Sequence, residues 1–176
     1  MFDFIVRRKI NSAFKNNRRN RTFKNLESIK DVLILFTYND WNEIQPIVRD
    51  LEQNGKNVVL WTTMPANIQQ NKHASILPIN VKVITKKEKN PLQILKQDIV
   101  SEYRRLSYDT LIDLTTKNSY TLKYLLVQNS SEFCIGISES SEKVYDYILL
   151  KEDDKSLHET YNQLKIYLDN MVSSTN

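Results

Sequence analysis

The stretch that decides the fold is Asp31 to Thr37, which has the sequence DVLILFT. Its five central residues, Val32 to Phe36, are all aliphatic or aromatic, so a strand built from them has no polar face. Strands of this kind are typical of parallel sheets that helices cover on both faces. Asn57 to Thr62 (NVVLWT) has the same character, and we expect it to be a neighbouring strand.

The residues between these two runs predict a helix. Asn39 or Asp40 offers an N-cap, and apolar side chains then recur at helical spacing as far as Leu51. Gly55 follows at the position where a left-handed residue commonly ends a helix. Strand, helix and strand in this order predict a βαβ unit with parallel strands.

The same alternation continues along the rest of the chain. We expect further strands at Val81–Thr85, Asp109–Thr115, Glu132–Ile137 and Tyr145–Leu150, and further helices at Asp3–Asn16, Pro91–Leu106, Ser119–Gln128 and Lys155–Val172. Residues 63 to 78 are a polar connection. The prediction is an α/β fold, a Rossmann-like three-layer sandwich with a mostly parallel sheet and a basic N-terminal helix. We divide it into a basic helix and linker (1–26) and the Rossmann-like domain (27–176).

Positive charge is concentrated at the start of the chain. Residues 1 to 30 hold nine lysines and arginines against two acidic residues, a net charge of +7, whereas the whole chain carries +4, so residues 31 to 176 carry −3. Such asymmetry indicates a polyanionic partner. The candidate nucleic-acid-binding residues are Arg7, Arg8, Lys9, Lys15, Arg18, Arg19, Arg21 and Lys24.

Three interpretations of this basic arm remain open. Its cations could contact the phosphates of RNA or of the ribosome, with Phe14 and Phe23 stacking on bases. Its apolar stripe, which includes Ile5 and Ile10, could instead lie in an anionic membrane surface. In the third, the stripe docks on the body and the charges are only solvated. Arginine and interleaved asparagine favour the RNA interpretation.

A second group of candidates lies where the buried strands end. In open α/β sheets, ligands bind beyond the carboxyl ends of the strands, near the switch in strand order. The cleft candidates are Asn39, Asp40, Asp113, Thr115, Lys117, Asn118 and Ser119. Asparagine and serine at such positions also cap helices. Asp113 alternates with aliphatic neighbours inside a strand, so we expect a buried, hydrogen-bonded carboxylate with a structural role.

Composition argues against several classes of function. The two glycines, Gly55 and Gly136, are far apart, so neither a P-loop nor a dinucleotide fingerprint can be written. The single cysteine, Cys134, allows no internal disulfide and fits a reducing cytoplasm. His73 and His158 form no metal-ligand spacing with it. We expect no cofactor, no metal and no catalytic residues. With no signal-peptide pattern and no bilayer-length apolar run, we expect a cytoplasmic protein.

The stretch from Tyr108 to Asp146, YDTLIDLTTKNSYTLKYLLVQNSSEFCIGISESSEKVYD, carries a resemblance. It is similar to an uncharacterised family of small Bacteroidota proteins, a domain of unknown function with a basic N-terminal segment and an "IGILF" strand. The matching residues are Asp109, Leu111, Ile112, Asp113, Leu114, Asn118, Ser119, Leu122, Lys123, Tyr124, Phe133, Gly136, Ser138, Glu139, Tyr145 and Asp146. The resemblance covers most of the chain and implies no activity.

A weaker likeness links Ile112 to Gly136 with the N-terminal half of heptosyltransferase-type glycosyltransferases. Those enzymes use a second Rossmann-like domain for the sugar nucleotide, so the likeness implies fold ancestry only. The sequence therefore predicts a non-enzymatic binding or accessory protein whose arm contacts RNA. A sugar- or nucleotide-binding enzyme, with Asp40 and Asp113 in its cleft, and a membrane-surface adaptor are the alternatives.

Overall fold

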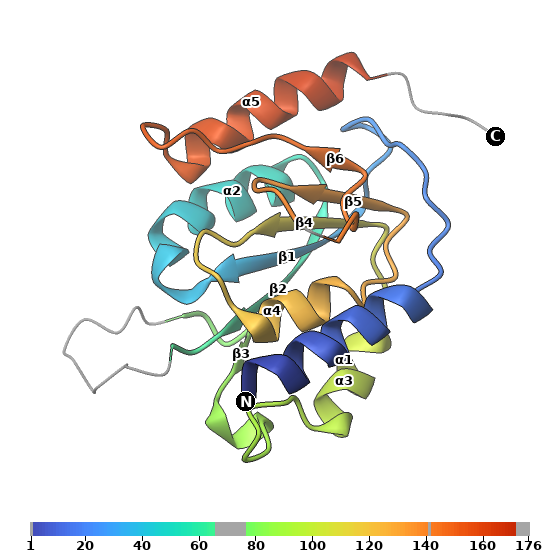
Figure 1. The fold of residues 1–176 in the computed structure, drawn as a ribbon. Coiled ribbons are helices and arrows are strands. Elements are labelled where there is room, and N and C mark those ends of the chain that lie inside the picture. The colour runs from blue at the N-terminus through green and yellow to red at the C-terminus, as the bar shows by residue number, and fades with distance from the viewer. Residues whose placement is uncertain (1, 66–76, 141, 172–176) are drawn as a thin grey trace.

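The computed structural model describes residues 2–65, 77–140 and 142–171. In this part of the chain six parallel strands form one sheet, in the order β3-β2-β1-β4-β5-β6 (Figure 1). The strands are β1 (Asp31–Thr37), β2 (Asn57–Thr63), β3 (Val81–Ile84), β4 (Thr110–Leu114), β5 (Phe133–Gly136) and β6 (Tyr147–Ile148). The chain therefore winds outward from β1 in both directions, and the strand order reverses between β1 and β4.

Helices cover both faces of the sheet. They are α1 (Phe2–Asn16), α2 (Trp41–Gln53), α3 (Gln97–Arg104), α4 (Tyr120–Leu126) and α5 (Leu157–Asn170). Two short 3₁₀ helices, η1 (Tyr38–Asp40) and η2 (Lys86–Glu88), follow β1 and β3. Figure 1 shows α2 and α5 on one side of the sheet and α1, α3 and α4 on the other. The predicted three-layer α/β sandwich is confirmed.

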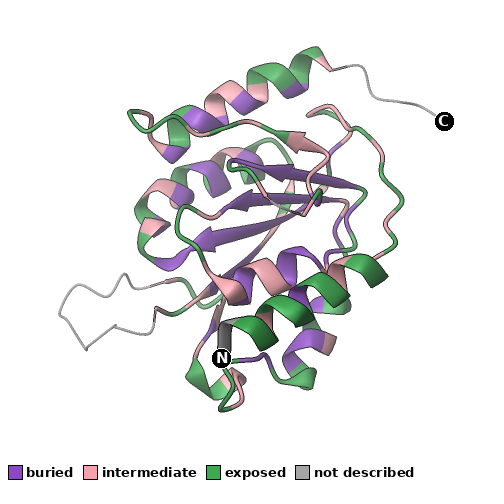
Figure 2. Cartoon of the chain, viewed as in Figure 1, coloured by how far each residue is buried: buried purple, intermediate pink, exposed green. Residues whose placement is uncertain are grey.

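The apolar run of β1 fills two cores. Val32, Ile34 and Phe36 pack with side chains of α2 and α5, whereas Leu33 and Leu35 pack with those of α3 and α4. Each of these five side chains is fully buried. Figure 2 shows the same division, with buried strands between helices that bury only their inner faces. The strand without a polar face is therefore the centre of the molecule.

The predicted helix between β1 and β2 ends as its sequence indicates. Gly55 has φ of 75°, a left-handed conformation that glycine adopts without strain. Its N–H donates to the carbonyl of Glu52 and the N–H of Lys56 donates to that of Leu51, both at 3.0 Å. These two bonds form a Schellman motif, which satisfies carbonyls that the helix leaves open.

The helix predicted from Pro91 is shorter than expected. Only Gln97–Arg104 is helical, and the residues before it form a turn in which Gln93 has φ of 56°. The side chain of Asn90 accepts a hydrogen bond from the N–H of Ile94 at 3.1 Å, and this local bond competes with the helix. A bridge between Lys89 and Leu95 holds the turn.

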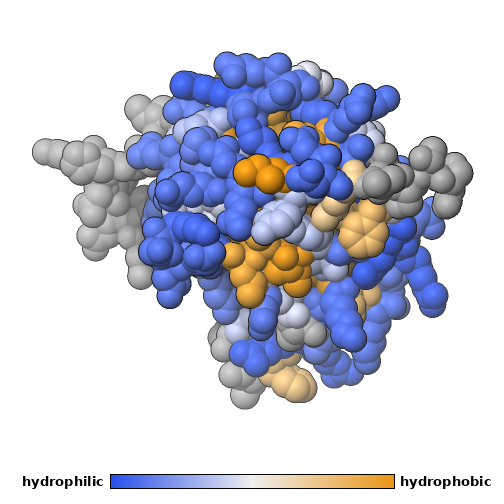
Figure 3. All heavy atoms as spheres, turned by 90° about the horizontal axis from the view of Figure 1, so that it is seen from above, coloured by the Kyte–Doolittle hydropathy of each residue, from blue (hydrophilic) through white to orange (hydrophobic). Residues whose placement is uncertain are grey.

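The last predicted strand is also shorter. Tyr145–Leu150 was expected, and Tyr147–Ile148 is observed, at the edge of the sheet beside β5. Seen from above, polar residues cover most of the surface and surround smaller apolar areas (Figure 3). None of the helices in the described ranges has the length and apolar character needed to cross a bilayer.

Candidate functional site

The β4–α4 loop lies at the carboxyl end of the sheet, where the strand order reverses. It is fastened to the end of β1 by the hydroxyl of Thr37, which accepts hydrogen bonds from the backbone N–H groups of Thr116 at 3.0 Å and Lys117 at 3.1 Å. The hydroxyl of Thr116 also donates to the carboxylate of Asp40. The two loops that the sequence places at one edge are therefore joined by hydrogen bonds.

The capping predictions have different outcomes at the two helices. The Ser119 hydroxyl accepts a hydrogen bond from the N–H of Leu122 at 3.3 Å, which confirms it as the N-cap of α4. Asp40 occupies the N-cap position of α2, but its side chain makes no capping bond. Its carboxylate is turned toward Thr116 instead, so its role is to hold the two loops together.

Two clefts flank the β4–α4 loop. The first, which we call the switch-point cleft, has a volume of about 350 Å³ and lies beyond β1, β2 and β4. It is lined by Thr37, Tyr38, Asn39, Thr63, Met64, Pro65, Lys89, Lys117, Asn118, Ser119 and Leu122. The second, the Asp113 cleft, has a volume of about 420 Å³ and is lined by Asp113, Thr115, Thr116, Lys117, Asn118, Ser119, Leu122, Lys123, Leu126, Ser138, Glu139, Ser140 and Tyr145. The cleft candidates except Asp40 line one or both of them.

Asp113 is buried at the base of the second cleft and its oxygens are both engaged. One oxygen accepts the backbone N–H of Thr115 at 3.0 Å, and the other accepts the hydroxyl of Tyr145 at 2.7 Å. Burial raises the pKa of Asp113, although these hydrogen bonds oppose the shift. Burial and the neighbouring Asp113 charge raise the pKa of Tyr145 as well. The predicted buried, hydrogen-bonded carboxylate is what the structure contains.

The packing of Tyr145 explains the second glycine of the chain. A Cβ atom built on Gly136 would lie 2.6 Å from Cζ of the Tyr145 ring, which is closer than real contacts allow. Gly136 therefore leaves the space in which the ring lies before its hydroxyl reaches Asp113. No P-loop or other phosphate cradle is involved, since this glycine has ordinary strand geometry.

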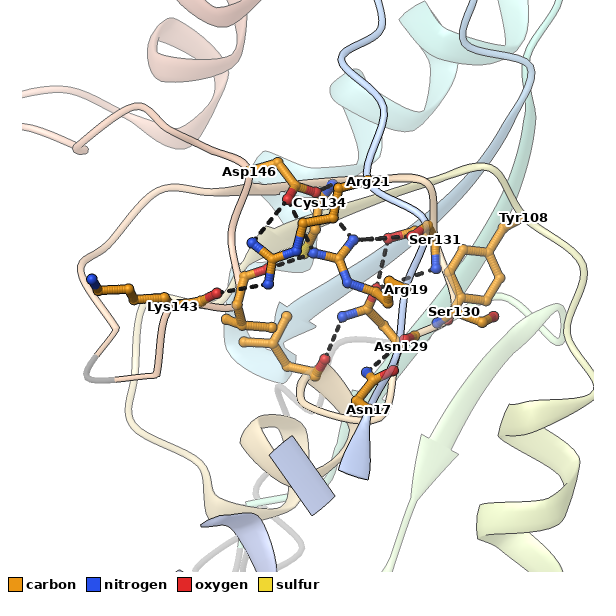
Figure 4. A network of polar contacts seen from close by, with 12 residues as sticks. Asn17, Arg19, Arg21, Tyr108, Asn129, Ser130, Ser131, Cys134, Lys143 and Asp146 are labelled. Carbon is orange, nitrogen blue, oxygen red and sulfur yellow. Dashed lines mark hydrogen bonds and ion pairs between the residues drawn. The ribbon is translucent and has the colours of Figure 1, made fainter. Parts of the chain in front are cut away.

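The basic arm is not a free extension in the structure. α1 packs on α4, and Ile10 of its apolar stripe is 2% exposed. Residues 17–24, which we call the anchored segment, continue along the body. The side-chain amide of Asn17 donates to the carbonyls of Val127 at 2.8 Å and Asn129 at 2.9 Å (Figure 4). One part of the third interpretation, in which the apolar stripe docks on the body, therefore agrees with the structure, since Ile10 is buried.

Arg19 holds the anchored segment most firmly. Its guanidinium forms two parallel bonds with the carboxylate of Asp146, at 3.1 and 3.2 Å, and the two side chains are only 3% and 4% exposed. It also donates to the carbonyls of Ser131 at 3.0 Å and Val144 at 2.8 Å (Figure 4). Asp146 in turn accepts the N–H of Cys134 at 2.8 Å. Arg19 is thus enclosed and cannot contact a phosphate.

Three further members of the predicted interface are partly engaged. Arg21 pairs with Asp146 at 3.3 Å while 49% of its side chain stays exposed. Lys24 pairs with Glu132 at 2.8 Å and is 15% exposed. Arg7 donates to the hydroxyl of Tyr120 at 3.3 Å. Such surface contacts contribute little to stability and can be exchanged for contacts with a ligand.

The other four members, Arg8, Lys9, Lys15 and Arg18, are exposed. No ion pair joins any of them to a carboxylate in the part of the chain that the structure describes. Figure 2 shows the outward side of α1 as mostly exposed. A groove of about 470 Å³ runs beside it and is lined by Lys9, Ser12, Ala13, Asn16, Asn17, Arg104, Tyr124 and Gln128.

Of the cysteine and the two histidines, the structure describes Cys134 and His158, which lie in separate elements. Cys134 is buried, and burial raises the pKa of its thiol above the ordinary range. His158 is exposed on α5 beside Asn162, and His73 lies outside the described residues. The residues described include no cluster of histidine, cysteine and carboxylates that could hold a metal ion.

The sequence did not identify three side chains that contribute to these contacts and clefts: Tyr145, Asp146 and Lys89. Tyr145 and Asp146 were recognised only as parts of a motif, although they complete the contacts of Asp113 and Arg19. Lys89 was not singled out, because it follows an apparently ordinary basic run. The signal for Asp146 was a carboxylate directly before an edge strand, which calls for a partner when buried.

A comparison with family models gives one match. The model described as a family of unknown function (DUF6913) matches residues 3–171, a range that includes α1, the anchored segment and both clefts. No curated protein matches the chain in sequence.

Proposed function

The chain therefore belongs to DUF6913, a family of unknown function, and we propose that it is a non-enzymatic binding or accessory protein that holds RNA against the outward side of α1. Ribosomal RNA is included in this class of partner. In our proposal the setting is the bacterial cytoplasm, which is consistent with the resemblance to small Bacteroidota proteins and with a single reduced cysteine.

The observation that carries the proposal is the set of cations on α1 and just after it. Arg8, Lys9, Lys15 and Arg18 are exposed, and no described carboxylate pairs with them. The docked helix and the anchored segment hold them in a fixed arrangement. Cations without acidic partners release bound counterions from a phosphate backbone when they contact it, and this supplies affinity.

The groove beside α1 adds groups that suit nucleotides. Lys9 and Arg104 lie on its walls, together with the amides of Asn16 and Gln128 and the ring of Tyr124. Amides can hydrogen-bond base edges, and an aromatic ring can stack on a base. Phe14 and Phe23, which the sequence suggested for stacking on bases, are less suitable. Phe14 packs against the core, and Phe23 lies against Phe133 with ring centroids 5.6 Å apart.

The membrane interpretation is less well supported. It requires the apolar stripe of α1 to face lipid, but Ile10 is buried against the body. Among the described side chains of α1, the large apolar ones exposed to solvent are Phe4, 70% exposed, and Ile5, 36% exposed. An interfacial helix buries a continuous apolar face in the membrane, and the apolar face of α1 is in part buried against the body instead.

The enzyme interpretation relies on the carboxylates of Asp113 and Asp40, which both accept hydrogen bonds within the protein. Both oxygens of Asp113 accept hydrogen bonds, and Asp40 accepts one from Thr116. The likeness of Ile112–Gly136 to heptosyltransferase half-domains stays an expectation about ancestry. A binding function therefore fits these residues better than catalysis does.

The test compares two variants with equal loss of charge. In the first, Arg8, Lys9, Lys15 and Arg18 are replaced by alanine; in the control, four exposed cations elsewhere, Lys30, Arg49, Lys86 and Lys87, are replaced. We expect the first variant to bind single-stranded RNA more weakly and to flatten the log–log salt dependence by about 3 units, because each phosphate contact contributes about 0.7. The control should keep most of the slope.

Fluorescence anisotropy over a salt series measures both quantities, and flotation with anionic liposomes is run in parallel. Equal losses in the two variants would show a nonspecific charge effect and overturn the proposal. Loss of liposome binding with RNA binding retained would favour the membrane surface instead.

A further inference from the structure

The switch-point cleft contains a lysine that forms no ion pair with a described carboxylate, although the charge of neighbouring Glu88 acts on it. Lys89 follows η2, is half-buried, and lines the cleft together with the exposed Lys117. Its ammonium donates to the hydroxyl of Thr63 at 3.2 Å, a neutral group. Burial lowers the pKa of Lys89, because an ammonium in this position has lost part of its hydration.

The nearest carboxylate in sequence is already used. Glu88 accepts the N–H and the hydroxyl of Thr85 in a capping box around η2. No ion pair of Lys89 is present among the described residues. Residues 66 to 76, which lie outside the description, contain no aspartate or glutamate in their sequence. A partly buried ammonium has lost some of its hydration, and an anion bound in the cleft would compensate that loss.

The position of this lysine is the one where the fold offers a binding site. The cleft lies beyond the carboxyl ends of β1, β2 and β4, at the reversal of strand order. Its volume of about 350 Å³ is at the small end of the range for ligand pockets. Hydroxyl and amide groups, including Thr37 and Asn39, complete its lining.

We propose that the switch-point cleft binds a small phosphate ester, with Lys89 as the counter-charge at its inner wall and Lys117 at its rim. Among the described lining residues, the cations are Lys89 and Lys117. A lysine ammonium is a point charge that binds phosphate oxygens without a fixed bidentate geometry, and two such charges match the charge of about −2 that a phosphate monoester carries. With no glycine in the lining, the phosphate is held by side chains and not by a backbone nest.

This site is separate from the proposed RNA surface. The cations of that surface, Arg8, Lys9, Lys15 and Arg18, do not line the cleft. Failure of either proposal therefore leaves the other standing, and a variant at Lys89 should bind RNA as the parent protein does.

The experiment uses the full chain, with ribose 5-phosphate as the probe. Two controls are included: ribose, which lacks the phosphate, and glutarate, which carries carboxylates instead of a phosphate. Calorimetry should show binding of ribose 5-phosphate alone. Lys89→Met should weaken it by about tenfold or more, the effect of removing one charge-assisted hydrogen bond. The matched control is Lys87→Met, an exposed lysine on η2 that should leave the affinity unchanged.

A second measurement does not depend on the variant. Carbon-13 NMR of the lysine ε-methylene groups should show the pKa of Lys89 rising when ribose 5-phosphate is added, while that of Lys87 stays in place. Equal affinities for glutarate and ribose 5-phosphate would overturn the phosphate assignment. An unchanged Lys89 signal, or equal weakening by Lys87→Met, would overturn the site.

Discussion

At the scale of single residues, Asp113 shows how a carboxylate can be held inside an apolar core. It is 7% exposed and lies in β4, where its sequence neighbours Leu111, Ile112 and Leu114 are aliphatic and buried. Its oxygens accept one backbone N–H and one tyrosine hydroxyl. Both donors are neutral, so hydrogen bonding rather than an opposite charge satisfies the group.

Replacing Asp113 with alanine should destabilise the protein. The substitution leaves the N–H of Thr115 and the hydroxyl of Tyr145 without their acceptor, at a cost of about 1 to 3 kcal/mol. The denaturant midpoint should fall with little change in the slope of the transition. Asp154→Ala, at an exposed acid, is the control. A midpoint equal to that control would mean that Asp113 has no structural role.

The pH dependence of stability gives a second test of Asp113. Because its pKa is raised in the folded state, the folded protein binds the proton more tightly than the unfolded chain, and stability is lost as pH rises. The loss begins above the unfolded value of 3.8 and continues through the raised folded pKa. Asp113→Asn keeps the shape and cannot titrate. The free energy of unfolding of wild type relative to Asp113→Asn should therefore decrease between pH 4 and pH 7, and an increase would contradict the assignment.

At the scale of elements, the anchored segment connects α1 to the far edge of the sheet. Arg19 is its main attachment, since its guanidinium binds Asp146 and two carbonyls in an enclosed site. Arg18, the preceding residue, is exposed. Neighbouring arginines thus have different environments, and they offer a matched comparison.

Arg19→Ala should lower the free energy of unfolding by about 3 to 5 kcal/mol, because it leaves a buried carboxylate without its main partner. Arg18→Ala should change it by less than about 0.5 kcal/mol. Urea unfolding followed by circular dichroism measures both. Similar values for the two variants would show that the Arg19 contacts contribute nothing to the fold.

The central elements could be predicted from the sequence because their signals are local. The apolar runs of β1 and β2 require a sheet that is covered on both faces. Gly55 has a left-handed conformation, which is typical of the residue that follows the C-terminal end of a helix. The helix after Pro91 was predicted too long, since apolar spacing outweighed the turn that the Asn90 side chain favours. The length of β6 was overestimated, since only two residues form the strand. An edge strand has few local constraints that would fix its ends.

At the scale of the whole molecule, the site could be predicted only in part. The topology brings the loops after β1 and β4 together, so most cleft candidates lie where the sequence placed them. The burial of Asp113 followed from its strand neighbours. Its partner Tyr145 lies 32 positions away and could not be identified from spacing. The attachment of the basic arm to the body depends on the contact between Arg19 and Asp146, which are 127 positions apart and could not be paired from the sequence.

This separation has a consequence for the order of events during synthesis. Domains can begin to fold while the ribosome is still extending the chain, starting from the N-terminal end. The acceptors of Arg19 on Ser131 and Asp146 are synthesised 112 and 127 residues after it. The anchored segment therefore cannot dock until Ser131 and Asp146 have been synthesised, and we expect its docking to be among the last steps of folding.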